Sequence, residues 1–388
     1  MGALSSSSTS DVVVIGSGLV GACVAYELSV AGIDVTLLDA ERAGRASDAG
    51  AGIASPQTFH DLDDEWYRFG RRALEHLHHL VRRLAEDGAG VGSEAFSQCG
   101  SLVVALAEHE DPFFDEVRRA VLGRDPAVSE VSADQATALF PPLARPHRAL
   151  YSPDSARVDG RILAGAVRQA ARRRGVTDAT TAVARIERRR GDGLRVVGEG
   201  TGVDCDSVVL AAGAWSAPLA QNLGAELPVS PTKGEIVHLA LGVGGPSPPD
   251  TARWPIVQPI LNFYLVAWPG GRVACGGTFT AQAGYDVRPT AAGVRDLLRE
   301  CLTIAPGLAD AALVETRVGL RPMSPDQRPM LGPLGSAPGV HVCTGHGANG
   351  LLLGPYSAAL VATAIATGHV APELGAYSPS RFTAPSLR

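Results

Sequence analysis

Residues 11–39 read DVVVIGSGLVGACVAYELSVAGIDVTLLD. Residues 11–15 form a short β-branched run, which is typical of a strand buried inside a parallel sheet. The segment Ala22–Ala31 is rich in helix formers, and Gly32 stands where a helix commonly ends. Ile33–Leu38 is apolar and predicts a second strand. The whole stretch therefore predicts a βαβ unit.

Three glycines in the first turn of this unit have the spacing of a dinucleotide-binding loop. Gly16 permits a tight turn out of the strand, Gly18 lets a pyrophosphate approach the backbone, and Gly21 lets the helix pack closely on the sheet. The pyrophosphate would lie at the helix N-terminus, where free N–H groups favour an anion. Asp39, at the end of the second strand, is placed to accept hydrogen bonds from an adenosine ribose. We predict a dinucleotide site; the alternative is an ordinary turn between a strand and a helix.

The composition argues against several classes of protein. Of the 388 residues, 45% are hydrophobic and 19% are charged, so the chain can bury a sizeable core. The net charge of −6 argues against a nucleic-acid partner, and Lys233 is the only lysine. The 6 cysteines form no Cys-x-x-Cys pair, and no run of about eighteen apolar residues occurs, so we expect no zinc site, disulfide scaffold or transmembrane segment. The expectation is a cytoplasmic protein with reduced thiols.

The rest of the chain alternates between helical and β-rich stretches. Residues 43–56 are small and lack any strand or helix period, which predicts a loop beside a flat, bulky group or, alternatively, a plain surface loop. Asp63–Asp87 predicts one long amphipathic helix, whose three histidines are expected on a solvated or half-buried face and not at a metal. The chain is β-rich from Pro228 to about Ala312, and a closing apolar helix is expected around Ser357–Thr367.

Seven motifs follow one another along the chain: GSGLVG, GAGIASP, VVLAAGAWS, PTKGEIVHL, FYLVAWPGGRVACGGT, VGLRPMSPDQRPMLGP and VCTGHGANGLLLGP. In this order they make the chain resemble the FAD-dependent D-amino acid oxidase superfamily, and within it the glycine oxidase and D-amino acid dehydrogenase branch. The resemblance runs from Asp11 to about Gly368. Nicotinamide-dependent dehydrogenases share the first motif but not GLRPMSPD or TGHGANG.

The resemblance implies an α/β fold with an α+β substrate domain. A GR2-type, Rossmann-like FAD-binding domain would be interleaved with a substrate-binding domain built on a mixed sheet. On this basis the FAD-binding domain comprises residues 10–88, 155–227 and 313–370, the substrate-binding domain residues 89–154 and 228–312, and the tails residues 1–9 and 371–388.

The resemblance also implies which residues hold FAD, and it predicts non-covalent binding. Asp39 holds the ribose where the family more often has Glu, and Val183 presents its main chain to adenine. Backbone N–H groups around Gly345–Leu351 would stabilise negative charge on the reduced flavin. Some sarcosine oxidases link FAD to a cysteine soon after the GLRP-type segment, whereas Cys343 lies in the next strand of this chain. The implied cofactor-binding residues are Gly16, Ser17, Gly18, Leu19, Val20, Gly21, Asp39, Ala40, Arg45, Ala46, Ser47, Ala49, Gly50, Ala51, Gly52, Ile53, Val183, Ala211, Ala212, Gly213, Trp215, Gly345, His346, Gly347, Ala348, Asn349, Gly350 and Leu351.

Two residues are implied to be catalytic. Arg321 matches the arginine that binds the substrate carboxylate in this family, and a guanidinium offers a planar, bidentate fork for that contact. The alternative is that Arg321 braces a loop by pairing with Asp326. Tyr264 matches a tyrosine whose hydroxyl contacts the same carboxylate, and its alternative is a core aromatic. Some glycine oxidases carry His two residues before that tyrosine, where this chain has Asn262, which argues against glycine itself as the substrate.

The implied reaction is oxidation of the C–N bond of a small amino acid or amine with a carboxylate: a D-amino acid, glycine or an N-methyl amino acid. Hydride would pass from the substrate Cα–H to flavin N5, and the imine would then hydrolyse. This route needs no protein base, so His346 is expected to be a turn residue or to tune the flavin. O2 or an electron-transfer partner would reoxidise the flavin, and a homo-oligomer is left open.

Three other functions stay open. A 2-hydroxyacid or glycerol-phosphate dehydrogenase has the same fold, but it needs a base for the hydroxyl proton, and a phosphate needs extra cations in the middle of the chain. Lys233, Arg253 and Arg272 are scattered there, which weakens that hypothesis. A flavoprotein without turnover and a tRNA-modifying flavoprotein belong to another class, and the net charge of −6 argues against the latter.

Overall fold

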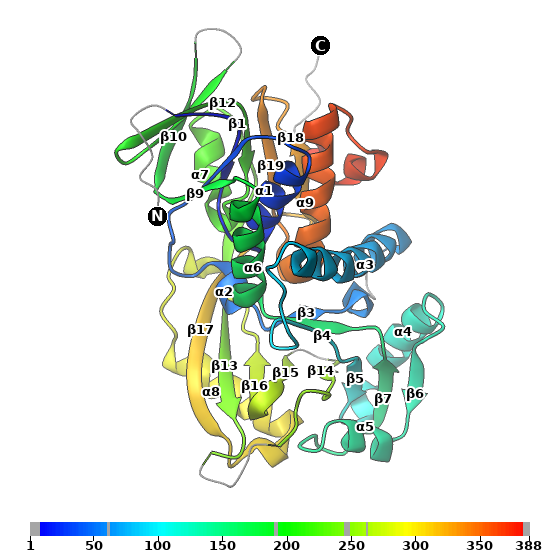
Figure 1. Cartoon of the computed structure of the whole chain (residues 1–388). Coiled ribbons are helices and arrows are strands. Elements are labelled where there is room, and N and C mark those ends of the chain that lie inside the picture. Colours follow the sequence, from blue (N-terminus) through cyan, green and yellow to red (C-terminus); the bar gives the residue numbers. More distant parts are fainter. Residues whose placement is uncertain (1–7, 60–62, 190–192, 244–248, 261–262, 383–388) are drawn as a thin grey trace.

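Strand β1, Ser8–Ile15, lies in the middle of the first of two large sheets, in the upper half of Figure 1. Its last four residues are buried, because it pairs in parallel with β2, Val35–Asp39, on one side and with β12, Thr201–Leu210, on the other. Helix α1, Leu19–Val30, connects β1 to β2 and packs against α9, Gly350–Thr367. The predicted βαβ unit is therefore confirmed.

The computed structural model describes residues 8–59, 63–189, 193–243, 249–260 and 263–382. In the first sheet the order is β10-β11-β12-β1-β2-β9, and β19 pairs with both β12 and β18. The remaining strands of this sheet are β9 Thr177–Thr180, β10 Val183–Arg188, β11 Leu194–Gly198, β18 Met330–Pro333 and β19 Val340–Thr344.

The second large sheet, in the lower half of Figure 1, has the order β17-β13-β16-β15-β14-β5-β7-β6 and mixes parallel with antiparallel pairs. Its strands are β5 Ser101–Ala105, β6 Ser129–Val131, β7 Arg148–Ser152, β13 Ser230–Ala240, β14 Ile256–Pro259, β15 Tyr264–Trp268, β16 Arg272–Gly276 and β17 Ala312–Met323. A small third sheet consists of β3 Ile53–Ala54, β8 Ala156–Val158 and β4 Phe96–Gln98. The expected α/β fold with a mixed second sheet is confirmed.

Helices cover both sheets. Besides α1 and α9 they are α2 Ala46–Ala49, α3 Asp64–Glu86, α4 Asp111–Leu122, α5 Ala133–Leu139, α6 Gly160–Arg173, α7 Ser216–Gln221 and α8 Ala291–Ile304. Shorter 3-10 helices are η1 Pro56–Phe59, η2 Glu108–Glu110, η3 Gly213–Trp215, η4 Pro269–Gly271, η5 Ala281–Ala283, η6 Pro306–Leu308, η7 Pro372–Tyr377 and η8 Pro379–Phe382.

The long helix predicted for Asp63–Asp87 is present as α3 with both of its ends where the sequence places them. The Asp63 carboxylate accepts a hydrogen bond from the Trp66 N–H at 2.8 Å, which caps the first turn. Asp87 is the C-terminal cap residue. Within the described residues there is no group of three or more His, Cys, Asp or Glu that could hold a metal ion.

Two expectations about local structure were wrong. The stretch 43–56 is not one loop, because it contains helix α2 and strand β3. Helix α9 begins at Gly350, seven residues before the expected Ser357, and it includes Pro355. Gly350 and Pro355 suggest a loop when read locally, but the apolar residues between them are buried against the first sheet. By length and composition α9 could cross a membrane, yet 56% of it is buried and it packs against α1 and α3, as a core helix does.

The division into two domains stays a proposal, and the structure differs from it in two places. Strand β17 belongs to the second sheet, although residues 313–323 were assigned to the FAD-binding part. The segment 371–382, assigned to a tail, contributes Tyr377 to the core, where its ring lies 4.5 Å from that of Phe69. The limit between the two domains therefore fits better near Met323 than at residue 313. The C-terminal limit of the FAD-binding domain fits better near Phe382 than at residue 370.

Candidate cofactor and substrate site

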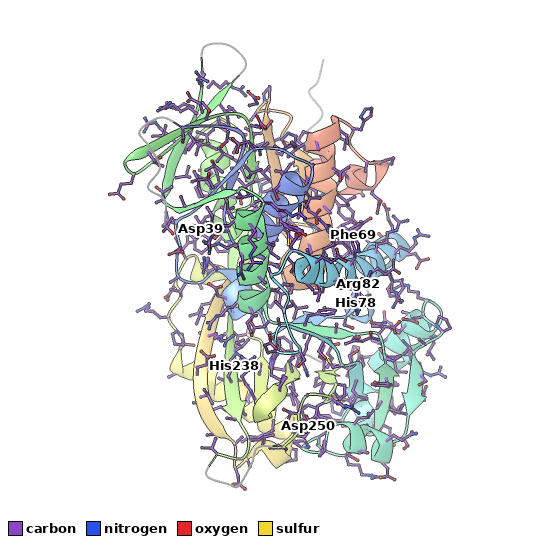
Figure 2. All side chains as sticks on the ribbon, in the orientation of Figure 1. Asp39, Phe69, His78, Arg82, His238 and Asp250 are labelled. Atoms are coloured by element: carbon purple, nitrogen blue, oxygen red, sulfur yellow. The ribbon has the colours of Figure 1, made fainter. Side chains whose placement is uncertain are left out.

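A cavity of about 990 Å³ is lined by residues from both large sheets. All the sequence-predicted site residues line it except Ser17, Leu19, Gly21 and Gly345. Arg321 and Tyr264 are both on its wall, at the end formed by the second sheet. Figure 2 shows Asp39 in the half of the molecule built on the first sheet and His238 on β13 in the other half.

Two of the three glycines in the turn after β1 have no room for a side chain. Gly16 has a φ of +107°, and a Cβ there would lie 2.5 Å from the Ala211 carbonyl oxygen. A Cβ on Gly21 would clash with the Gly16 carbonyl, so Gly21 serves helix–strand packing and does not line the cavity. Gly18 borders the cavity, and its nearest neighbour is the Ser47 hydroxyl, 3.1 Å from a built Cβ. Gly16 and Gly21 thus have the turn and packing roles that the spacing predicts, and the role of Gly18 beside a pyrophosphate stays a prediction.

Asp39 is held by the backbone at the end of β2. Its carboxylate accepts hydrogen bonds from the N–H groups of Ser17 and Glu41, each at 2.5 Å. The Arg45 guanidinium lies 3.5 Å away. Asp39 lines the cavity while only 8% exposed. The buried Ser17 hydroxyl has no partner in the described part of the chain.

The turn between β19 and α9 forms another part of the wall. Gly345 and Gly347 have φ values of +77° and +54°, and the Gly347 N–H donates to the Pro322 carbonyl at 2.9 Å. His346 is 2% exposed, and burial lowers its pKa to about 4, so the ring is neutral near pH 7. Its Nε2 has no partner among the described residues. The sequence therefore placed His346 correctly at the cavity, while its role stays a prediction.

Arg321 is fixed by three contacts on the cavity wall. Its Nη1 donates to the Thr278 carbonyl at 2.8 Å, and its Cζ lies 4.5 Å from the centre of the Phe279 ring. The guanidinium covers the Cα of Gly234, where a Cβ would clash with it. The loop-bracing alternative is wrong, because Asp326 instead binds Arg381 at 2.8 Å.

Tyr264 lies beside Arg321. A Cβ on Gly277 would come 2.6 Å from the Tyr264 hydroxyl and 2.9 Å from Arg321 Nη2, so both polar groups converge over this glycine. Burial raises the pKa of Tyr264, and the nearby Arg321 charge opposes that increase. Asn262, which argued against glycine as substrate, lies outside the described residues.

Several wall residues escaped the sequence analysis. Gly234 and Ile236 lie within the PTKGEIVHL motif and Thr278 ends the FYLVAWPGGRVACGGT motif, so the motifs themselves could have indicated them. Phe263 begins the same motif. No local pattern marks the others, which include Arg42, Thr181, Asn222, Gln258, Ile260 and Phe279.

Comparison with known proteins agrees with this geometry. The chain matches the family described as FAD dependent oxidoreductase (DAO) over residues 11–364. Glycine oxidase of Pseudomonas aeruginosa is 32% identical over 364 residues, covering 90% of this chain and 93% of that protein. The crystal structure of iminodiacetate oxidase from Chelativorans sp. BNC1 has a TM-score of 0.85 at 35% identity, covering 95% of this chain and 98% of the other. Glycine oxidase from Geobacillus kaustophilus has a TM-score of 0.86 at 27% identity, covering 97% and 100%. The chain therefore belongs to the DAO family of FAD-dependent oxidoreductases, and its cofactor is FAD.

Proposed function

We propose that the chain oxidises the C–N bond of a small amino acid or amine that carries a carboxylate. The observation that supports this best is Arg321, a half-buried cation on the cavity wall. Among the described residues it hydrogen-bonds a backbone carbonyl and has no carboxylate partner. A buried or half-buried guanidinium without an acid is costly unless an anion occupies its remaining donors.

The chain's own residues then have distinct tasks. Arg321 and the Tyr264 hydroxyl would bind the substrate carboxylate and so fix the position of its Cα. The turn at Gly345–Leu351, the glycine turn at Gly16–Gly21 and Asp39 would hold FAD, which supplies the hydride acceptor when it is bound. His346 is neutral and therefore adds no second positive charge beside the substrate amine.

The named relatives support an amine in place of an alcohol. Two of them are glycine oxidases and one is an iminodiacetate oxidase, a name that denotes oxidation of a secondary amine. Secondary amines therefore remain candidates beside primary amino acids. A glycerol-phosphate substrate would need cations to bind its phosphate. Lys233 and Arg272 are already paired with carboxylates, Lys233 with Glu235 at 3.0 Å and Arg272 with Asp159 at 3.3 Å, which argues against this alternative.

The test is anaerobic reduction of the purified holoenzyme, followed as loss of the flavin's long-wavelength absorbance. The panel contains D- and L-amino acids, glycine, N-methyl amino acids, iminodiacetate and 2-hydroxy acids. We expect bleaching by at least one amine with a carboxylate and none by the matching hydroxy acid. Bleaching by hydroxy acids alone, or by no carboxylate at all, would overturn the proposal. Repeating the reaction in air with an oxygen electrode separates an oxidase from a dehydrogenase.

A further inference from the structure

We propose that Lys233 and Glu235 are positioning residues for Arg321, acting through the segment 277–290, here called the strap. The strap runs from the end of β16 to the start of α8. Phe279 of the strap lines the cavity and is 59% exposed, so this part of the strap stands at the cavity mouth. The inference rests on the proposed function only in that it takes the ligand of Arg321 to be a carboxylate.

The base of the strap is a buried ion pair. Lys233 and Glu235 are two residues apart on β13, so they share one face of the strand, while Gly234 between them faces the cavity. Lys233 Nζ lies 3.0 Å from Glu235 Oε1, and the two side chains are 4% and 3% exposed. A buried ion pair is tolerated only when further hydrogen bonds satisfy its remaining donors and acceptors.

The far end of the strap supplies hydrogen bonds to the ion pair, and its near end is bonded to the main chain of β13. Lys233 Nζ donates to the Arg288 carbonyl, and Glu235 Oε1 accepts from the Thr290 N–H at 3.1 Å. At the other end, the Glu235 N–H donates to the Thr278 hydroxyl at 2.8 Å. Lys233 and Glu235 thus hold the end of the strap through their side chains and its beginning through the main chain, as in an Ω-loop whose ends are close.

The middle of the strap contacts the cofactor half of the cavity. The Tyr285 hydroxyl donates to the Ala214 carbonyl at 3.0 Å, and its ring stacks on Trp215 with centres 5.7 Å apart. Val287 fills the space that a side chain on Gly44 would need. The strap therefore bridges the two halves of the molecule at the rim of the cavity.

The first residues of the strap set the position of the Arg321 guanidinium. Arg321 donates to the Thr278 carbonyl and packs against the Phe279 ring. The side chains of Lys233 and Glu235 hold the far end of the strap, whereas Thr278 is bonded to the main chain of Glu235. Loss of the ion pair would free the far end, so that the strap could shift and carry Phe279 and the guanidinium packed against it out of position. The expected consequence is weaker carboxylate binding, with the flavin and its site unchanged.

The experiment uses the fact that Lys233 is the only lysine in the sequence. FAD-loaded enzyme is exposed briefly to an amine-reactive acetylating reagent, and acetylation of Lys233 is quantified by mass spectrometry. Glu235→Gln is compared with Asp286→Asn, a matched change that removes an exposed ion pair with Arg288 on the same strap. We expect Glu235→Gln to raise the initial rate of Lys233 acetylation about tenfold or more, and Asp286→Asn to leave it as in the parent.

The second readout is ligand affinity, measured by titrating acetate against the flavin absorbance and by steady-state kinetics. Glu235→Gln should raise the acetate Kd and the substrate KM about tenfold, with kcat within about twofold and FAD content unchanged. Lys233→Arg, which keeps the ion pair, should restore KM toward the parent value relative to Lys233→Met. If Glu235→Gln does not fold, Tyr285→Phe loosens the strap without touching a buried charge and should raise acetylation in the same direction.

The outcomes separate this inference from the proposed function. Unchanged Lys233 acetylation in both Glu235→Gln and Tyr285→Phe would overturn the role of the strap. Faster acetylation with unchanged acetate affinity would overturn the coupling to Arg321. If acetylation and acetate affinity respond as expected but no amine reduces the flavin, the proposed reaction fails while the strap inference stands.

Discussion

At the scale of single residues, the absence of a side chain at Gly234 shapes the site as much as the presence of Arg321. The sequence pointed to Arg321 because a guanidinium in the GLRP segment has a recognisable chemistry and a recognisable place in the family. The PTKGEIVHL motif contains Gly234 but does not show why that position must lack a side chain, because this need arises only when β13 and β17 pair and Thr232 comes opposite Arg321. Phe279 and Gln258 escaped for the same reason, because tertiary contacts alone bring them to the cavity.

We expect Gly234→Ala to displace the guanidinium and raise the substrate KM about tenfold, while FAD content and the flavin spectrum stay as in the parent. Steady-state kinetics and the flavin absorbance measure both effects. Gly165→Ala is the control, because Gly165 lies in α6 with nothing within 4 Å of a built Cβ. That control should be neutral or stabilise the protein by about 0.5–1 kcal/mol. An unchanged KM in Gly234→Ala would contradict the placement of Arg321.

Arg321→Lys and Arg321→Met test the carboxylate contact directly. Lysine keeps the charge but loses the planar fork, so we expect KM to rise about tenfold in Arg321→Lys and about a hundredfold in Arg321→Met. Arg145→Met removes an exposed arginine that pairs with Asp134, and it should leave KM unchanged. Equal KM values for the parent and Arg321→Met would exclude Arg321 as the carboxylate ligand.

At the scale of elements, the sequence predicted those that carry their own local signals. Helix α3 was placed within one residue at each end because it has an apolar stripe, an aspartate cap and no internal proline. The start of α9 was missed because Gly350 and Pro355 oppose helix formation locally, whereas burial against the first sheet favours it. The strap could not be predicted at all, since the hydrogen bonds that hold it join residues far apart in the chain.

The turn from β1 into α1 offers a prediction with two separable effects. Gly21→Ala pushes a methyl group into the Gly16 carbonyl, so we expect it to destabilise the FAD-free protein by about 1–3 kcal/mol. Gly18→Ala meets only the movable Ser47 hydroxyl, so it should leave that stability nearly unchanged and instead weaken FAD binding, because the methyl group enters the cavity.

Chemical denaturation of the FAD-free protein and titration with FAD measure the two effects separately. If both variants lost stability equally, the distinction between a packing glycine and a cofactor-facing glycine would be wrong. Equal FAD affinity in Gly18→Ala and the parent would likewise count against a pyrophosphate beside Gly18.

At the scale of the whole molecule, the sequence predicted the class of fold but not the assignment of every strand. The βαβ unit and the β-rich middle were evident from local patterns. Nothing local distinguishes β17 as a member of the second sheet, since its partner β13 lies about eighty residues earlier in the chain. Pairing of that kind depends on the completed tertiary structure.

Stability of the whole molecule should depend on pH through buried His238. Both of its ring nitrogens lack a partner within the described residues, and burial together with nearby Arg317 and Arg272 lowers its pKa to about 4. The unfolded chain has the ordinary histidine value of about 6.5. Between pH 6.5 and 4 the unfolded state therefore binds more protons, and the free energy of unfolding falls as the pH is lowered through this window.

The measurement is denaturant unfolding at pH 7.5 and pH 5 for the parent and His238→Leu. We expect the parent to lose about 2 kcal/mol more than His238→Leu between the two values, because leucine cannot take up a proton. His369→Gln, at an exposed position, serves as the control and should behave as the parent. Identical pH slopes for the parent and His238→Leu would show that His238 is not the group responsible.

The order of strands in the first sheet has a consequence for how the protein is made. β1 and β2 leave the ribosome first, but β12 comes from residues 201–210 and its neighbour β19 from residues 340–344. The first sheet, to which we assign the adenosine end of the coenzyme, therefore stays incomplete until most of the polypeptide has been synthesised. Capture of the coenzyme is then a late event in biogenesis, and a nascent chain arrested before residue 340 should fail to retain it.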